Sequence, residues 1–176
     1  MTMSVMDSRG SHVCVNCNSM CAADDLYCFR CGYILPHAMG DSETHLLGKT
    51  SSHEVDLQWG TGYFHHRARL FLRLAEGPYA ETTISVQFQI PSIVIGRTVG
   101  SEAVNVDLTP FGAQNLGVSR RHVRIDRIND SLLIHDLDSS NGTFLNRTRL
   151  VPKTPHVLRN RAVLELGKFV LRVQFA

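Results

Sequence analysis

Residues 67–74 read RARLFLRL, so that alanine or leucine occupies every second position of this stretch. Successive side chains of a β-strand point to opposite faces, whereas one face of a helix repeats every three to four residues. The period of two therefore predicts a half-buried strand whose arginines face solvent. The same alternation recurs in residues 84–90, which read ISVQFQI.

Further short apolar runs follow along the chain, and no segment carries a sustained helical stripe. The runs cover residues 104–108, 123–128, 132–136, 163–166 and 169–175. Turn-forming sequences such as Asn129-Asp130, Asn141-Gly142 and Gly167 separate several of them. Many short strands joined by such turns predict an all-β fold, and we expect a β-sandwich.

The composition narrows the class of protein. The chain has 176 residues, with 18 Lys and Arg against 16 Asp and Glu, which gives a formal charge of +2. This balance disfavours proteins that coat nucleic acid or an anionic membrane through bulk charge. No apolar stretch approaches the roughly 20 residues needed to cross a bilayer, and the N-terminus lacks the apolar core of a secretory signal. We therefore expect a cytoplasmic protein that does not contact membranes.

All five cysteines lie between Cys14 and Cys31. Cys14-x-x-Cys17 and Cys28-x-x-Cys31 are two pairs whose turns can close a tetrahedral thiolate site around one metal ion. The segment is too short to bury a core of its own, so metal binding would supply its folding energy. The spacing predicts one structural Zn²⁺ held by these four thiolates, with Cys21 left free. The alternatives are a thioredoxin-type redox pair, free buried thiols, or a metal site in which Cys21 replaces Cys17.

The cysteine segment resembles a short zinc ribbon, in residues 27–32 (YCFRCG) and in the apolar Ile34-Leu35 pair behind them. Zinc ribbons bind DNA, bind proteins or serve as folded ends of a chain. Asp24 and Asp25 offset Arg30 here, and four thiolates around one Zn²⁺ carry net negative charge. The segment is therefore not basic, which disfavours binding to nucleic acid.

These patterns divide the chain into four parts. Residues 1–11 are polar and unpatterned, and we expect them to be disordered. The zinc ribbon covers residues 12–36. Residues 37–66 contain scattered glycine, serine and threonine and predict a flexible linker, whose aromatic end is expected to dock on the following domain. The sandwich covers residues 67–176.

Three polar motifs lie between the expected strands. They are Gly96-Arg97, Ser119-Arg120-Arg121-His122, and residues 138–146, which read DSSNGTFLN. Guanidinium groups, hydroxyls and a side-chain amide are all donors and suit an anion with several oxygens. The chain lacks paired carboxylates at a cleft motif, a phosphate-cradling glycine loop before a helix, and a nucleophile elbow. A binding module rather than an enzyme is therefore expected.

The order of these motifs resembles the forkhead-associated (FHA) domain, a β-sandwich that binds phosphothreonine. The family pattern is Gly-Arg, then Ser-x-x-His, then Asn-Gly-Thr with a following Asn, and every part is present from about residue 67 onward. The resemblance implies an eleven-stranded sandwich with its binding loops at one end. Residues 106–113, which read VDLTPFGA, also look like bacterial members of the family.

The resemblance also implies the roles of individual residues. Arg97, Ser119 and Arg120 would contact the phosphate, with Arg120 also able to reach the peptide backbone. Ser140 would touch phosphate as well, and Asn141 would bond the backbone of the phosphothreonine peptide. Four further positions would shape the loops without touching the ligand: Gly96, His122, Gly142 and Asn146.

The leading prediction is a non-catalytic signalling module that recognises a partner protein phosphorylated on threonine by a Ser/Thr kinase. One alternative is a nucleic-acid-associated regulator, in which the ribbon touches DNA and the sandwich recruits a phosphorylated partner. A thiol redox enzyme that uses one CxxC pair is a third reading. Preference for threonine over serine rests on the resemblance alone.

Overall fold

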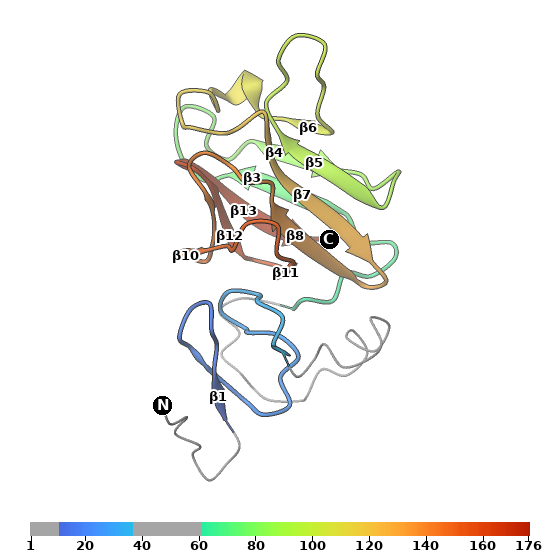
Figure 1. Cartoon of the computed structure of the whole chain (residues 1–176). Helices are drawn as coiled ribbons and strands as arrows, with labels where there is room; N and C mark the ends of the chain where they lie inside the picture. The colour runs from blue at the N-terminus through green and yellow to red at the C-terminus, as the bar shows by residue number, and fades with distance from the viewer. Residues whose placement is uncertain (1–10, 37–60) are drawn as a thin grey trace.

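The computed structural model describes residues 11–36 and 61–176, and these form two bodies in contact (Figure 1). Residues 11–36 form a small cysteine-rich unit with one two-stranded sheet, β1 (His12–Val13) and β2 (Met20–Cys21). We call this unit the ribbon. The expected disordered N-terminus and most of the expected linker, including Trp59, lie outside the described residues.

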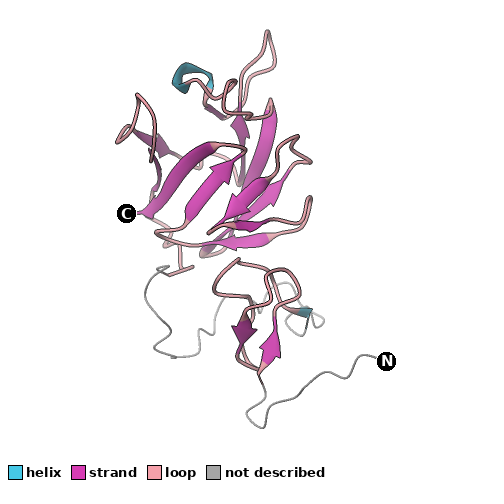
Figure 2. Ribbon diagram, turned by 90° about the vertical axis from the view of Figure 1, so that its left-hand side faces the viewer, coloured by secondary structure: helices cyan, strands magenta, loops and turns pink. Residues whose placement is uncertain are grey.

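The second body is a β-sandwich of two sheets, as the alternation predicts (Figure 2). The six-stranded sheet has the order β10 (Thr148–Arg149), β9 (Thr143–Leu145), β12 (Val163–Leu166), β13 (Phe169–Phe175), β3 (Leu70–Leu74) and β4 (Thr83–Val86). The five-stranded sheet has the order β11 (His156–Leu158), β8 (Ser131–Asp136), β7 (Arg121–Ile128), β5 (Ser92–Gly96) and β6 (Val106–Asp107). Among the strands of the described residues, only β5 and β6 pair in parallel, and a short 3-10 helix, η3 (Thr109–Phe111), follows β6. The all-β fold is confirmed, with the eleven sandwich strands that the resemblance implies.

Alternate residues of the strands build the core between the sheets. Leu70 and Leu72 of β3 are fully buried, and Arg73 between Leu72 and Leu74 faces solvent. The next strand is shorter than expected, because β4 ends at Val86 and leaves Ile90 52% exposed. Phe64, which we assign to the linker from the sequence, is fully buried against this core and packs edge-on against Phe175.

The ribbon docks on the edge of the five-stranded sheet, at the opposite end of the sandwich from η3 (Figure 1). β11 is the edge strand, and its His156 forms an antiparallel bridge with Tyr33 of the ribbon. The backbone N–H of Val157 donates to the carbonyl of Gly32 at 2.7 Å. A Cβ atom on Gly32 would lie 2.3 Å from the carbonyl oxygen of Val157, so only glycine permits this approach.

Four consecutive carbonyl groups of the ribbon accept hydrogen bonds from the sandwich. Phe29 accepts from Arg159 Nη1 at 2.8 Å, and Arg30 accepts from Asn146 Nδ2 at 3.1 Å. Cys31 accepts from His156 Nδ1 at 3.1 Å, and Gly32 accepts from the Val157 N–H. Because residues 29–32 form the turn around the second cysteine pair, the conformation of that turn and its docking are coupled.

Burial in this interface has an electrostatic consequence. Desolvation lowers the pKa of His156 to about 4, against the smaller opposing effect of the Cys31 carbonyl. His156 is therefore neutral near pH 7, with its proton on Nδ1, where it donates to that carbonyl. A neutral donor matches the buried contact without bringing an unpaired charge into it.

Candidate functional site

The three predicted motifs meet at one end of the sandwich, where the loops after β5, before β7 and after β8 come together. Gly96 lies at the end of β5 against the chain before β7, and a Cβ atom there would be 2.0 Å from the Arg120 carbonyl oxygen. The N–H of Arg97 donates to this same carbonyl at 2.9 Å. The first two loops are therefore joined through the backbone as well as through side chains.

Arg97 is half-buried and held in place on two sides. Its Nε donates to the Val118 carbonyl at 2.6 Å, and its Nη1 donates to Gln114 Oε1 at 3.2 Å. These contacts fix the plane of the guanidinium group at the loop edge before any ligand arrives. A guanidinium fixed in this way loses little side-chain entropy when it binds an anion.

His122 ties the second loop to the third. The N–H of Ser119 donates to His122 Nδ1 at 2.9 Å, so the ring proton is on Nε2 and donates to the Gly142 carbonyl at 3.2 Å. The ring is fully buried, and this burial lowers the pKa of His122 despite the opposing effects of Gly142 and Asp136. The histidine is therefore neutral and structural in this geometry.

The half-buried Ser119 and the exposed Ser140 and Asn141 form the rim of the site. Ser119 Oγ accepts from the N–H of Ser140 at 3.1 Å, so the hydroxyl proton remains available to an anion. Asn141 Nδ2 donates to the Gly117 carbonyl at 2.9 Å, and the side chain is exposed. Arg120 is also exposed, and it lies 3.7 Å from Glu102 in an exposed ion pair that contributes little to stability.

Two carboxylates support the loops from behind. Asp136 at the end of β8 accepts from the N–H and hydroxyl of Ser139 and from the Thr143 hydroxyl. Asp107 accepts from the N–H of Thr98 and from the N–H and hydroxyl of Thr109. Burial raises the pKa of Asp107, but these hydrogen bonds outweigh it and lower the pKa to about 2. Both loops are thus anchored by side-chain carboxyl groups that accept several hydrogen bonds.

Asn146 does not lie at this end of the sandwich. The three-residue strand β9 separates it from Asn141 and Gly142, and it is buried beside the ribbon. Its Oδ1 accepts from the Val163 N–H at 2.9 Å while its Nδ2 donates to the Arg30 carbonyl. Among the predicted architectural residues, Gly96, His122 and Gly142 belong to the loops, whereas Asn146 joins the two bodies.

Three supporting residues are absent from the sequence prediction. Gln114 and Val118 hold Arg97, and Gly117 holds Asn141. Gly117 has φ +78°, and a Cβ atom there would lie 2.4 Å from Asn141 Nδ2. In the sequence, the signal for this contact is a glycine, Gly117, two residues before Ser119 of the second motif.

The second candidate site is the cysteine cluster of the ribbon. The sulfur atoms of Cys14, Cys17, Cys28 and Cys31 all lie within 4.8 Å of one another, and Cys21 is not part of this group. The Cys14–Cys31 and Cys17–Cys28 sulfur distances are 3.7 and 3.5 Å. Zn–S bonds of about 2.3 Å in a tetrahedron require sulfur atoms about 3.8 Å apart, whereas a disulfide requires about 2.05 Å. The four thiols therefore fit a tetrahedral metal ion.

Residues 93–167 match the family model of the FHA domain. The solution structure of an FHA domain of Arabidopsis thaliana is similar to this chain, with a TM-score of 0.52 and 28% identity. The superposition covers 66% of this chain and 92% of that domain.

Two curated proteins are similar over shorter stretches. An FHA domain-containing protein of Arabidopsis thaliana is 33% identical over 44% of this chain and 18% of its own length. A probable E3 ubiquitin-protein ligase of Schizosaccharomyces pombe is 44% identical over 28% of this chain and 20% of its own length. This chain thus matches about a fifth of either relative, and its resemblance to bacterial members stays a prediction.

The sandwich of this chain is an FHA domain.

Proposed function

We propose that the protein is a non-catalytic module that binds phosphothreonine on a partner protein through Arg97, Ser119, Arg120, Ser140 and Asn141. The observation that carries this proposal is the meeting of these five side chains at one end of the sandwich, with Arg97 fixed by Gln114 and Val118. A phosphate carries about −1.5 to −2 charge and three acceptor oxygens. Two guanidinium groups, two hydroxyls and an amide complement both properties.

The ribbon contributes structure rather than chemistry in this proposal. One Zn²⁺ held by Cys14, Cys17, Cys28 and Cys31 would stabilise it, with each cysteine ligating as thiolate. Thiolates held on one ion are not free nucleophiles for redox catalysis, and the fifth thiol, Cys21, is buried. No helix among residues 11–36 and 61–176 is both long and apolar enough to cross a bilayer. We further propose that the partner is a cytoplasmic substrate of a Ser/Thr kinase.

The test is calorimetry of the full chain with a phosphothreonine peptide selected from a degenerate library, together with its phosphoserine and unphosphorylated versions. Arg97→Ala removes one charge-assisted contact of about 1.5–3 kcal/mol, so affinity should fall roughly ten- to a hundredfold. Ser119→Ala should weaken binding less, since it removes one neutral hydroxyl.

Arg69→Ala is the matched control, because Arg69 is exposed and outside the loops. Thermal unfolding of each variant checks that the sandwich remains intact. Equal affinity of Arg97→Ala and the unmodified chain for the phosphorylated peptide would remove Arg97 from the site. Equal affinity for the phosphorylated and unphosphorylated peptides would overturn the proposed function as a whole.

A further inference from the structure

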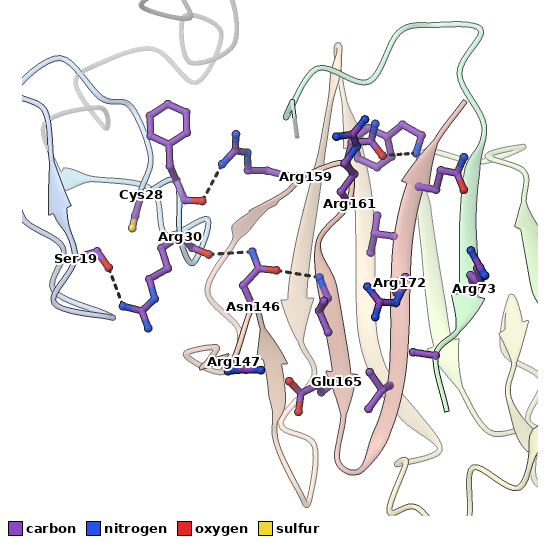
Figure 3. Close-up of a pocket in the computed structure, with 18 of the residues that line it drawn as sticks. Ser19, Cys28, Arg30, Arg73, Asn146, Arg147, Arg159, Arg161, Glu165 and Arg172 are labelled. Carbon is purple, nitrogen blue, oxygen red and sulfur yellow. Dashed lines mark hydrogen bonds between the residues drawn. The ribbon is translucent and has the colours of Figure 1, made fainter. Parts of the chain in front are cut away.

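A groove lies between the ribbon and the outer face of the six-stranded sheet (Figure 3). Its ribbon side includes Met20 and Phe29, and its sheet side includes Val163 and Val170. Six arginines line it: Arg30, Arg73, Arg147, Arg159, Arg161 and Arg172. None of the five residues of the proposed phosphothreonine site belongs to this lining.

The groove concentrates positive charge that the whole chain does not show. Its carboxylate residues are Glu76 and Glu165, so six arginines minus two glutamates leave +4 from these side chains, beside the Cys28 thiol of the cysteine cluster. The complete chain carries only +2. Positive charge is therefore concentrated on this surface, although the composition of the whole chain is nearly balanced.

Several of these arginines have no acidic partner in the part of the chain that the structure describes. Arg147, Arg161 and Arg172 form no ion pair there, whereas Arg73 pairs with Glu81. Arg172 of β13 lies directly opposite Arg73 of β3 in the register of the sheet. Like charges facing each other across strands destabilise a sheet, and an anion between them would remove this cost.

Two arginines of the groove have a left-handed backbone conformation, which Glu81 and Lys153 also adopt outside it. Arg147 is the second residue of the two-residue turn between β9 and β10, with φ +65°. Arg161 has φ +65° as well. Glycine adopts this left-handed conformation at the lowest cost, and arginine is an expensive choice for it. Both expensive positions point to the same groove.

The ribbon side of the groove is held in place before any ligand binds. Arg159 donates to the Phe29 carbonyl, and its guanidinium lies 4.8 Å from the centre of the Phe29 ring. Arg30 Nη1 donates to Ser19 Oγ at 3.4 Å, as Figure 3 shows. The docked ribbon thus forms a fixed wall, so an occupant does not have to order it.

The lining favours a peptide over a nucleic acid. Single-stranded nucleic acid is bound by stacking its bases on open aromatic faces, but Phe29 packs under Arg159 and Phe175 packs against Phe64. Met20, which is 65% exposed, and the half-buried Val163 and Val170 instead offer aliphatic surface between the arginines. We propose that this groove is a second binding site, which takes an acidic peptide segment with interspersed aliphatic residues from a protein partner.

Fluorescence anisotropy of the full chain tests this site directly. The probes are a labelled twelve-residue peptide of repeating Glu-Glu-Leu and a labelled oligothymidylate of equal length, both at about 50 mM salt, where screening is weak. Arg161→Glu/Arg172→Glu reverses two charges in the groove, and peptide affinity should fall about tenfold or more. Arg67→Glu/Arg69→Glu makes the same change at exposed positions outside the lining and should leave affinity within about twofold.

A second double substitution tests whether a loss of peptide affinity could result from misfolding of the first variant. Arg147→Gly/Arg161→Gly removes two charges while placing glycine at two left-handed positions, so the fold is retained and peptide affinity should still fall several-fold. Arg97→Ala should leave binding of the acidic peptide unchanged, which separates this site from the phosphothreonine loops. Equal peptide affinity in the groove and control variants, or tighter groove-dependent binding of the oligonucleotide, would overturn the proposal.

Discussion

The ribbon and the sandwich reach a folded state by different means. The sandwich encloses a continuous core of leucine, isoleucine and valine from both sheets, with Phe64 closing one side. The buried cluster of the ribbon consists of Cys14, Cys21, Cys28, Cys31 and Leu35. Burial of apolar side chains stabilises the sandwich. Most buried positions of the ribbon are instead thiols, and we expect these to stabilise its fold only when they bind a metal ion.

The interface between the two bodies reflects this difference. The sandwich contributes side-chain donors such as Asn146 and Arg159, and the ribbon contributes backbone carbonyls from one turn. Residues 29–32, which form the turn around the second cysteine pair, thus present four backbone carbonyls to the sandwich, although the ribbon has almost no apolar core. We therefore expect docking of the ribbon to depend on a bound metal ion, and the fold of the sandwich to be independent of it.

Metal removal should have the largest effect and separate the two bodies. A chelator, or Cys28→Ser, should unfold the ribbon, because structural zinc supplies about 10–16 kcal/mol in small zinc domains. The sandwich should stay folded on its own core. Amide NMR should show loss of dispersed signals from residues 12–36, with shifts at Asn146, His156 and Val157 in the interface.

Cys21→Ser is the matched control for metal removal, because Cys21 is buried but lies outside the sulfur cluster. It should retain one bound ion per chain, as measured by metal analysis of the purified protein. Widespread loss of dispersed signals from residue 67 onward after chelation would show that the two bodies share one folding unit.

Leu72→Ala in the sandwich core should destabilise the sandwich and leave the ribbon folded, which is the opposite of metal removal. Leu72 is fully buried in β3, and truncation of such a leucine costs about 2–5 kcal/mol. Urea unfolding followed by circular dichroism should report this loss, while zinc affinity of the ribbon stays near that of the unmodified chain. Leu35→Ala in the ribbon should do the reverse, weakening zinc binding with little change in the main unfolding transition.

Gly32→Ala should detach the ribbon without emptying its metal site. The new Cβ atom would meet the Val157 carbonyl, and φ at Gly32 is +72°. Gly77→Ala carries the same backbone cost at φ +83° but has no atom within 4 Å of the new Cβ. The left-handed conformation alone costs about 1 kcal/mol, so the excess loss in thermal stability of Gly32→Ala over Gly77→Ala measures docking. Equal losses in the two variants would contradict the interface.

Acidification should act on the sandwich and, through the buried His156, on its contact with the ribbon. Burial lowers the pKa of His122 below its ordinary value of 6.5, so the unfolded chain binds more protons than the folded one in this range. The contribution of neutral His122 to the free energy of unfolding is therefore fully present above pH 6.5. It is lost as the pH falls from 6.5 through the lower pKa of His122 in the folded state. His135, beside Asp126 and Arg124, has a pKa lowered by burial and adds to the same trend.

NMR titration of the imidazole resonances checks this prediction residue by residue. The His122 signals should titrate below pH 6.5 and disappear with unfolding of the loops. His122→Asn should flatten the pH dependence of the unfolding free energy relative to the unmodified chain. A His122 midpoint at or above 6.5 would be incompatible with a neutral, buried ring that accepts from Ser119.

Strands with clear alternation could be predicted from the sequence. Alternation indicates the runs that contain β3 and β4, whereas β7, β8, β12 and β13 are indicated as short apolar runs. The short strands β9, β10 and β11 were not, because two or three residues are too few to show a period. Ile90 continues an apolar alternation beyond the end of β4, so pattern alone overestimated that strand.

The loops of the candidate site were indicated by the order of their motifs, while their supports were not. Gln114 and Val118 hold Arg97 from positions that carry no recognisable signal, and Val118 does so through its carbonyl. The docking of the ribbon was equally hidden, since backbone carbonyls accept its main contacts. The arginine groove joins residues from distant strands, so only the folded chain shows that they share one surface.

The bridge between Tyr33 and His156 has a consequence for solubility. β11 is the outermost strand of its sheet, and the ribbon covers its free edge. Uncovered strand edges with unpaired N–H and C=O groups recruit other chains and promote aggregation. A chain that lost its metal ion would expose this edge while its sandwich stayed folded, so it would self-associate in a concentration-dependent way. Metal supply would then control the colloidal state of the protein without changing its phosphopeptide loops.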